Sequence, residues 1–294
     1  MLPTSPPEMA TTRLQSRRAF IALFATPASL SACRGTNTAS SAQTTPEPEP
    51  RVSAESNDVV MFAASSLTLV LDKMWQAFRM QPGNEGLAFT ANYGSSSQLR
   101  TQLQEGAEAD IFASADVAQM EQVAKAGLVD GNATIFARNR LVVIVPNGNP
   151  GKVTTLADLA KPGVKFVTTP PDVPIGAYAR ASLKKLASDT ANGNGYDAKV
   201  LANIVSEEAN VRQVVVKVQL GEADAGICYA TDVTTVPAGE VTTIDIPDSA
   251  NVVAEYPIAI LKSAKAPAAA RRLISFINSP SGQSILVAAK FKPA

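Results

Sequence analysis

Short apolar runs alternate with amphipathic helical segments from residue 59 to residue 277, and this alternation restricts the folds open to the chain. In segment 67–80, apolar side chains recur at helical spacing on one face while charged side chains lie on the other. Such alternation predicts an α/β fold in which helices cover parallel sheets. The strand-like runs are 59–64, 88–93, 110–113, 141–145, 164–168, 225–229, 241–246 and 252–261, and the helical segments are 67–80, 97–104, 117–126, 175–186, 211–220 and 268–277.

Small polar residues follow several expected strands, where a helix is about to begin. In open α/β sheets, ligands bind at the carboxyl ends of the strands, beside the positive ends of the following helices. If several such turns met in one cleft, their free N–H groups would hold an anion without a cationic side chain. Ordinary helix capping also accounts for each turn taken alone, so both interpretations stay open. The turns are Ser65-Ser66, Gly94-Ser95-Ser96-Ser97, Val173-Pro174-Ile175-Gly176 and Glu208-Ala209-Asn210.

The composition narrows the range of functions. The 294 residues include 26 basic and 26 acidic side chains, so the net charge does not favour binding to nucleic acid. The chain has no histidine, which excludes Ser/His/Asp and Cys/His nucleophile systems and removes the commonest zinc ligand. Carboxylate catalysis is not excluded in this way.

Residues 1–33 have the pattern of a bacterial export signal. Residues 16–21 read SRRAFI, a twin-arginine pattern, although an arginine pair also serves an ordinary secretion signal and Met9 is an alternative start. The apolar run 19–30 is too short to span a bilayer. The following LSAC at 30–33 resembles a lipobox, so we expect Cys33 to carry lipid and to become the mature N-terminus.

Residues 34–57 are rich in Ser, Thr, Ala, Pro and Glu and include PEPEP at 46–50. Such a stretch cannot bury enough apolar surface to offset its ordering entropy, and its Pro/Glu part is expected to be extended. It therefore predicts a disordered tether that leaves the lipid as the sole contact with the membrane. With Cys33 lipidated, Cys228 has no disulfide partner and is expected to be a buried free thiol.

A series of segments, in order along the chain, resembles the molybdate-binding proteins of ABC uptake systems. The resemblance spans about residues 59–290, nearly the whole predicted mature body. The segments are 62–68 (FAASSLT), 93–99 (YGSSSQL), 106–116 (GAEADIFASAD), 172–179 (DVPIGAYA), 210–212 (NVR), 226–232 (GICYATD) and 255–259 (EYPIA).

This resemblance implies a two-lobed, periplasmic-binding-protein-like fold of type II with a hinge between the lobes. Each lobe would have a central, mostly parallel sheet flanked by helices. We expect the first lobe at 57–141 plus 236–294 and the second at 142–235. The implied function is capture of molybdate, and of tungstate as well, outside the cytoplasm by a monomeric receptor for an ABC importer permease. The resemblance therefore implies a binding protein without a cofactor rather than an enzyme.

The resemblance also assigns a shell of hydrogen-bond donors to the oxyanion. At position 175 the family more often has alanine, but the role implied there belongs to the backbone. The implied donors are hydroxyl and backbone groups of Ser66 and Ser96 in the first lobe, the backbone N–H groups of Ile175 and Val211 and the hydroxyl of Tyr229 in the second, with Ser65 and Ser95 as neighbours able to share the role.

A shell made only of donors favours a fully deprotonated anion. Phosphate near neutral pH keeps a proton, and leaving that proton unpaired in a desolvated cleft costs about 1–3 kcal/mol. Sulfate has the charge and shape of molybdate but is smaller, so its exclusion depends on the size of the cavity. Tungstate and molybdate are nearly the same size, and the sequence does not separate them.

Alternative functions stay open beside this one. The protein would be a sulfate receptor if the cavity were smaller, or an iron receptor if Tyr93, Tyr178 and Tyr229 acted as phenolate ligands. Ser96 would be the nucleophile of a serine hydrolase, although GSSS at 94–97 lacks the Gly-x-Ser-x-Gly elbow. A purely structural lipoprotein is a further alternative.

Three charged positions have interpretations of their own. Asp110 and Asp116 flank a strand end, where a metal or acid–base pair is conceivable. We instead expect Asp116 to cap the helix that starts at residue 117 and Asp110 to bond nearby backbone. Arg212 is expected to form a salt bridge with Glu207 or Glu208.

Overall fold

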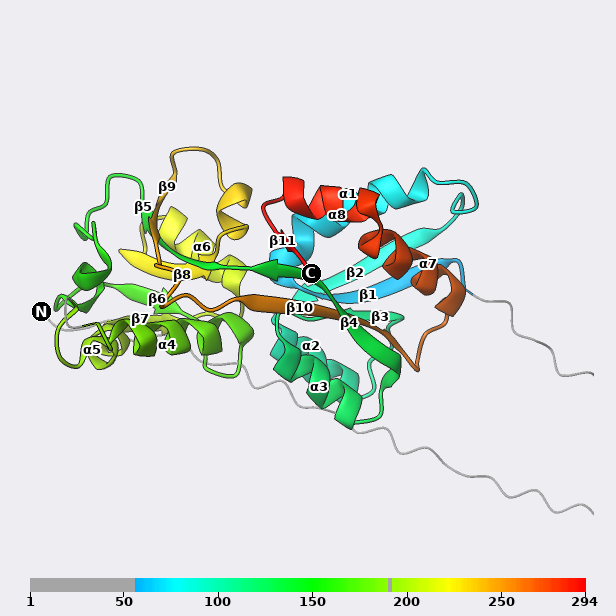
Figure 1. Ribbon diagram of the computed structural model, residues 1–294, viewed down its shortest axis with the longest axis horizontal. Coiled ribbons are helices and arrows are strands. Elements are labelled where there is room, and N and C mark those ends of the chain that lie inside the picture. The colour runs from blue at the N-terminus through cyan, green and yellow to red at the C-terminus, as the bar shows by residue number, and fades with distance from the viewer. Residues whose placement is uncertain (1–55, 190–191) are drawn as a thin grey trace, which may run out of the picture. The chain divides into compact units, whose positions relative to one another are not determined.

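The computed structural model describes residues 56–189 and 192–294. The predicted export signal, Cys33 and all but the last two residues of the predicted tether lie outside these residues. The described part contains two β-sheets, each with helices packed against it (Figure 1). Each sheet with its helices is called a lobe below, and the two-lobed α/β architecture agrees with the predicted fold.

The first lobe is built on a six-stranded sheet with the order β11-β4-β10-β3-β1-β2. β1 pairs in parallel with β2 and β3, whereas β10 runs antiparallel to β3 and β4. The strands are β1 (Asp58–Ala64), β2 (Ala88–Gly94), β3 (Ile111–Ala113), β4 (Val129–Asn139), β10 (Ala254–Leu261) and β11 (Lys292–Pro293). The helices are η1 (Ser65–Leu67), α1 (Thr68–Arg79), α2 (Ser96–Gln104), α3 (Val117–Lys125), α7 (Pro267–Asn278) and α8 (Pro280–Ala288).

The second lobe is built on a five-stranded sheet with the order β7-β6-β8-β5-β9. β6 pairs in parallel with β7 and β8, and β5 runs antiparallel to β8 and β9. The strands are β5 (Leu141–Pro146), β6 (Phe166–Thr168), β7 (Ile204–Glu207), β8 (Ala225–Tyr229) and β9 (Val241–Asp245). The helices are η2 (Leu156–Ala160), α4 (Pro174–Leu186), α5 (Tyr196–Ala202), α6 (Val211–Gln219) and η4 (Asp232–Thr235).

Two details differ from the sequence-based expectation. Both sheets are mixed rather than mostly parallel, because β4, β5, β9 and β10 pair antiparallel to their neighbours. In addition, β9 pairs with β5 in the second sheet, although the expected boundary at residue 236 assigned this strand to the first lobe.

The chain passes between the two sheets twice, once from β4 to β5 and once from β9 to β10, as the green and brown ribbons of Figure 1 show. The buried side chain of Asn251 ties the two crossings together. Its Oδ1 accepts from the N–H of Leu141 at 3.0 Å, and its Nδ2 donates to the carbonyls of Leu141 at 2.9 Å and Ile246 at 3.2 Å. The Arg140 guanidinium also donates to the Ile246 carbonyl, at 3.0 Å. A hinge between the lobes would act at these two crossings.

Apolar burial fixes the helices on the sheets. The expected face of α1 is buried at Val70, Leu71, Met74 and Phe78, as the 3.6-residue period requires. Every residue of β5 is buried, which matches its uninterrupted apolar sequence.

Cys228 is a buried free thiol, as predicted. No helix among the described residues is long and apolar enough to cross a membrane.

Candidate anion-binding site

The strand-to-helix turns of both lobes meet at one small cavity. All seven residues that the sequence nominated line it, namely Ser65, Ser66, Ser95, Ser96, Ile175, Val211 and Tyr229. The space not filled by protein atoms there is about 210 Å³, open solvent included. The enclosed cavity itself is far smaller than the roughly 300–1,000 Å³ of pockets for drug-sized ligands, so it suits a small ion. None of the described residues that line it is charged.

The register of the first sheet brings its turns together. Ala64 at the end of β1 lies opposite Gly94 at the end of β2, so Ser65 and Ser95 emerge side by side. β3 is parallel to β1, with Ala113 beside Ala63, and therefore delivers Ala115 to the same edge. Parallel pairing thus places the turns that follow β1, β2 and β3 at the same edge of the sheet.

The serines after β2 have different roles. Ser95 is the N-cap of α2, where its Oγ accepts from the N–H of Gln98 at 3.3 Å in a capping box. Ser96 is the first residue of the helix, and its Oγ accepts from the N–H of Ala115 at 2.9 Å. With a lone pair of Ser96 engaged in this way, its hydroxyl hydrogen remains available to donate into the cavity.

Two helix starts of the second lobe supply backbone donors. Ile175 lies in the first turn of α4, behind Pro174, and Val211 is the first residue of α6. N–H groups at these positions have no intrahelical acceptor, and each helix places the positive end of its dipole here. Gly176 makes the close packing at α4 possible, because a Cβ at this position would lie 2.1 Å from the carbonyl oxygen of Pro170.

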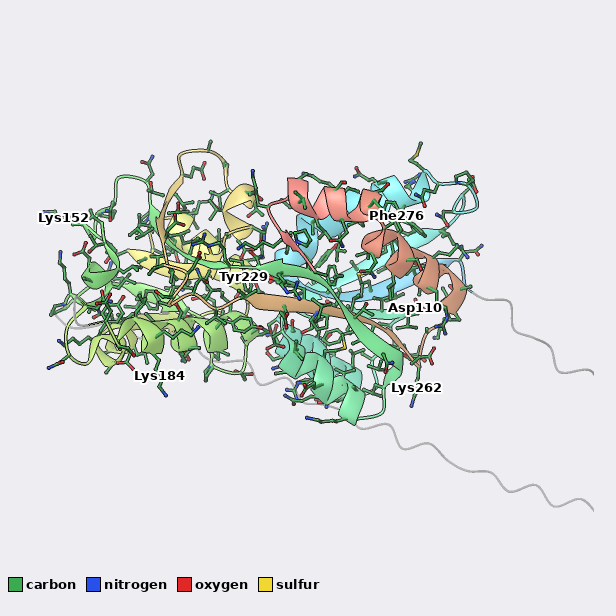
Figure 2. The ribbon with its side chains drawn as sticks, viewed as in Figure 1. Asp110, Lys152, Lys184, Tyr229, Lys262 and Phe276 are labelled. Atoms are coloured by element: carbon green, nitrogen blue, oxygen red, sulfur yellow. The ribbon has the colours of Figure 1, made fainter. Side chains whose placement is uncertain are left out.

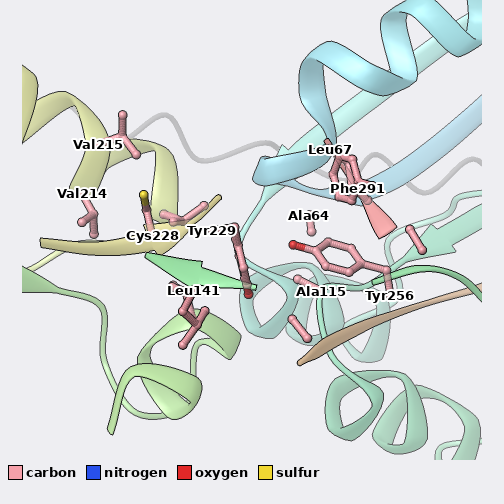
Figure 3. Packing of buried hydrophobic residues seen from close by; sticks show 14 of the residues in the cluster. Ala64, Leu67, Ala115, Leu141, Val214, Val215, Cys228, Tyr229, Tyr256 and Phe291 are labelled. Atoms are coloured by element: carbon pink, nitrogen blue, oxygen red, sulfur yellow. The ribbon is translucent and has the colours of Figure 1, made fainter. Parts of the chain in front are cut away.

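Tyr229 ends β8 and closes the cavity from the second lobe. Its side chain is 1% exposed, and among the described residues its hydroxyl has no hydrogen-bond partner. Burial raises the pKa of Tyr229 well above its usual value, and the neighbouring Tyr256 adds to the effect. The phenol therefore stays protonated and can donate a hydrogen bond. Figure 3 shows Tyr229 facing Tyr256, whose ring lies 5.7 Å away centre to centre.

The donors at the cavity are neutral, because none of the described residues that line it carries a charge. Figure 2 shows Tyr229 near the middle of the described body, while the labelled Lys152, Lys184 and Lys262 lie at its periphery. Hydrogen bonds between neutral donors and an anion, together with the helix dipoles, would have to supply the attraction. Such a shell binds an ion less strongly than a shell with a charged side chain would.

A buried carboxyl lies behind Tyr229. Asp232 is 0% exposed, and its Oδ2 accepts from the N–H of Tyr229 at 3.1 Å. Burial raises the pKa of Asp232 to about 7, while this N–H and the charge of Arg212 act in the opposite direction. Asp232 lies at the end of the segment 226–232 that carries the family resemblance, but no local pattern in the sequence marks it as part of the site.

The other charged candidates lie outside the cavity. Asp116 caps α3 by accepting from the N–H of Gln119 at 2.8 Å, as expected. Asp110 accepts from the backbone N–H groups of Val60 and Ala266, both at 2.7 Å, also as expected. Within the described ranges, no three or more His, Cys, Asp and Glu residues are placed to hold a metal ion.

Two further expectations can be compared with the contacts. The hydroxyl of Tyr93 donates to Asp72 at 3.2 Å and does not line the cavity, so the three tyrosines of the iron-receptor alternative do not share it. The expected salt bridge of Arg212 is wrong. The neighbouring carboxylates are engaged elsewhere, Glu207 with Arg180 and Glu208 with Lys217 at 3.1 Å.

Comparison with known proteins assigns the class. Residues 59–292 match the family described as bacterial extracellular solute-binding protein, and the chain belongs to this family. Among its relatives, the molybdate-binding protein ModA of Mycobacterium tuberculosis is 41% identical over 228 residues, which cover 78% of this chain and 82% of that protein.

Solved structures support the fold. The periplasmic molybdate-binding protein of Azotobacter vinelandii has a TM-score of 0.68 at 23% identity, covering 80% of this chain and 99% of that one. The sulfate-binding protein SubI of Mycobacterium tuberculosis has a TM-score of 0.71 at 19% identity, covering 81% and 87%. Because both identities are low, these two likenesses bear on the architecture alone.

The raised pKa of Asp232 should make the stability of the ligand-free protein depend on pH. Because the folded-state pKa is about 7 and the ordinary value is 3.8, the folded protein holds a proton that the unfolded chain releases. Stability should therefore fall as the pH rises from about 4 to 7 and level off above that. Asp232→Asn should reduce the loss of unfolding free energy between pH 5 and 8 by about 1–3 kcal/mol, as measured by urea denaturation.

The matched control is Asp248→Asn, because the side chain of Asp248 is 93% exposed. This variant should lose unfolding free energy between pH 5 and 8 as the wild type does. If Asp232→Asn and the wild type lost the same unfolding free energy between pH 5 and 8, Asp232 would be ionised in the folded protein over that whole pH range.

Proposed function

We propose that this protein captures molybdate, and tungstate as well, outside the cytoplasm and delivers it to the permease of an ABC importer. The observation that carries the proposal is the buried Tyr229 hydroxyl, which lacks a partner among the described residues and lines a cavity where several strand-to-helix turns meet. The 41% identity to a protein named for molybdate binding supports the choice of ion.

The ion would be held by donors from both lobes. Ser66 and Ser96 donate from the first lobe, and the N–H groups of Ile175 and Val211 and the hydroxyl of Tyr229 donate from the second. Ser65 and Ser95 stand beside them, with Ser95 already engaged as a helix cap. Because the shell has contributions from both sides, an ion bound there stabilises the closed arrangement of the lobes.

The chemistry of the shell selects among anions by protonation. A molybdate dianion presents only acceptors to this shell. Hydrogen phosphate brings a proton, and none of the lining residues is a carboxylate that would accept it. A buried proton without an acceptor costs about 1–3 kcal/mol, which weakens phosphate relative to molybdate.

Sulfate is the second candidate ligand, because a cavity whose lining has no carboxylate suits any fully deprotonated tetrahedral dianion. It carries the same charge and presents the same four acceptors, so hydrogen bonding does not separate it from molybdate. Sulfate is the smaller ion, and donors placed around a larger ion would not all reach it. Competition between the two ions measures this difference.

Binding without turnover is the simplest account of the site's chemistry. A serine hydrolase needs a base that takes the proton of its nucleophile. The Ser96 hydroxyl instead accepts from the N–H of Ala115, and the other described residues around the cavity include no Lys, Asp or Glu. We therefore propose that the protein is a receptor that acts as a monomer and needs no cofactor.

The ligand predictions concern Tyr229. Calorimetry should show binding of molybdate and tungstate by the wild type, weaker binding of sulfate, and still weaker binding of phosphate. Tyr229→Phe should lower molybdate affinity by about 1.5–3 kcal/mol, roughly tenfold to more than a hundredfold, because it removes one hydrogen bond to an anion. The same variant should be as stable as the wild type without ligand, or more stable, because it removes a buried hydroxyl without a protein partner.

The matched control is Tyr93→Phe, which also deletes one hydroxyl but loses a bond to Asp72 outside the cavity. It should keep the wild-type affinity. If the wild type binds none of the four anions, or if Tyr229→Phe binds molybdate like the wild type, the proposed site is wrong.

The proposed location rests on the sequence of the N-terminal segment. We propose that the exported chain is anchored by lipid on Cys33 and that residues 34–57 tether the receptor to the outer face of the membrane. Cys33→Ala should move the protein from the membrane fraction to the soluble extracytoplasmic fraction, as followed by immunoblotting of fractionated cells. Cys228→Ala is the control, because that thiol is buried and distant in sequence. Retention of Cys33→Ala in the membrane fraction would contradict lipidation.

A further inference from the structure

Behind the cavity, buried polar side chains form a connected row. The Ser66 Oγ lies 3.1 Å from the hydroxyl of Tyr256, and the Tyr256 hydroxyl lies 3.5 Å from Nδ2 of Asn139. The same Nδ2 donates to Oγ1 of Thr231 at 2.7 Å. The row begins at a residue that lines the cavity, passes through β10 and the end of β4, and ends in the second lobe just after β8.

The central residue of this row is held rigidly. Tyr256 is 0% exposed, and its ring makes edge contacts with Phe136, Tyr229 and Phe291. Figure 3 shows its hydroxyl end directed towards Tyr229, between Ala64 and Ala115. A ring packed on three sides has little freedom to turn, so its hydroxyl oxygen has a fixed position.

The donors in this row have a defined direction. Oδ1 of Asn139 accepts from the N–H of Arg140 at 3.0 Å, which identifies the other amide atom as the nitrogen. That nitrogen can only donate, so the Tyr256 oxygen accepts from it. The hydroxyl of Tyr256 has one hydrogen, and Ser66 is its other hydrogen-bond partner among the described residues. We therefore assign this hydrogen to the Ser66 oxygen, which leaves the Ser66 hydrogen free to point into the cavity. Burial raises the pKa of Tyr256 well above its usual value, so the phenol keeps its proton.

We propose that Tyr256 and Asn139 are positioning residues that fix the Ser66 hydroxyl as a donor, and so make the site selective for fully deprotonated oxyanions. This inference rests on the proposed function. Ser66 alone would be free to rotate and to accept a hydrogen bond from a protonated anion. The hydroxyl of Tyr256 occupies one lone pair of the Ser66 oxygen and so turns the Ser66 hydrogen towards the ion, as the N–H of Ala115 does for Ser96. In this orientation Ser66 meets the anion with its hydrogen, which favours an anion oxygen that carries no proton.

The test is a double-mutant cycle of Tyr256→Phe and Ser66→Ala, measured by calorimetry with molybdate and with phosphate. Phenylalanine keeps the packed ring and deletes only the hydroxyl. Tyr256→Phe should weaken molybdate binding about tenfold and should weaken phosphate binding less, so that the ratio of the two affinities falls. In the Ser66→Ala background the same substitution should have no further effect on molybdate affinity, because its effect passes through Ser66.

Tyr196→Phe is the matched control for a purely structural role. Tyr196 is also 0% exposed, and its hydroxyl donates to the Leu156 carbonyl at 2.7 Å, away from the cavity. It should lower the melting temperature and leave both affinities unchanged. Two results would overturn the inference while leaving molybdate binding by the wild type intact. In the first, the losses of molybdate affinity from Tyr256→Phe and Ser66→Ala add up in the double variant. In the second, Tyr256→Phe leaves the ratio of molybdate affinity to phosphate affinity unchanged. Failure of the wild type to bind molybdate would overturn the proposed function and this inference with it.

Discussion

Backbone N–H groups at the first turns of α2, α4 and α6 are the constraint on which the site depends. These groups have no acceptor within their own helices, yet the turns that carry them lie against one another at a cavity between two lobes. A buried donor without an acceptor is costly, so an arrangement of this kind is stable when something rich in acceptors fills it. A tetrahedral oxyanion offers acceptors in every direction and is drawn to the same place by the helix dipoles. The parallel pairings of β1 with β2 and of β6 with β8 are the architectural means of bringing the turns there.

The use of neutral donors has consequences for transport. A charged side chain would bind the ion more strongly but would also oppose its release. Here the attraction is distributed over hydroxyl and amide groups from both lobes, so that parting the lobes removes part of the shell. The two crossings between the sheets, bridged by Asn251, are the connections about which such a motion would occur. Binding strength and lobe closure are thereby linked through the same few hydrogen bonds.

Much of the architecture followed from the period of the apolar residues. Strands and helices that begin or end at the cavity were predicted, because their apolar runs are long and their turns carry Ser, Gly, Pro or Asn. β4 was missed because residues 131–134 are exposed and polar or small, which hides the strand. The short β7, β11 and α5 carry too few residues for a period to show. α8 was missed too, and it starts at Pro280, directly after the cap Ser279 that ends α7. Strand direction cannot be read from periodicity, which is why the antiparallel pairings of β5 and β10 were not foreseen.

The site was only partly accessible to the same reasoning. Its seven nominated residues do line one cavity, but their convergence was implied by the family resemblance rather than by any local pattern. Tyr256 and Asn139 escaped notice because their contacts join residues 190 and 117 positions apart in the chain. Asp232 was overlooked for a different reason, since a carboxyl beside an anion site is unexpected until its burial is known.

The place of the ion can be found by anomalous scattering at the molybdenum absorption edge, recorded from crystals grown with sodium molybdate. We expect a single strong peak in the cavity between Ser96 and Tyr229, with N–H and O–H donors around the ion and no Lys or Arg side chain in contact with it. A peak bound to a basic side chain elsewhere, or a cavity without a peak, would show that the ion is not held by neutral donors from the two lobes.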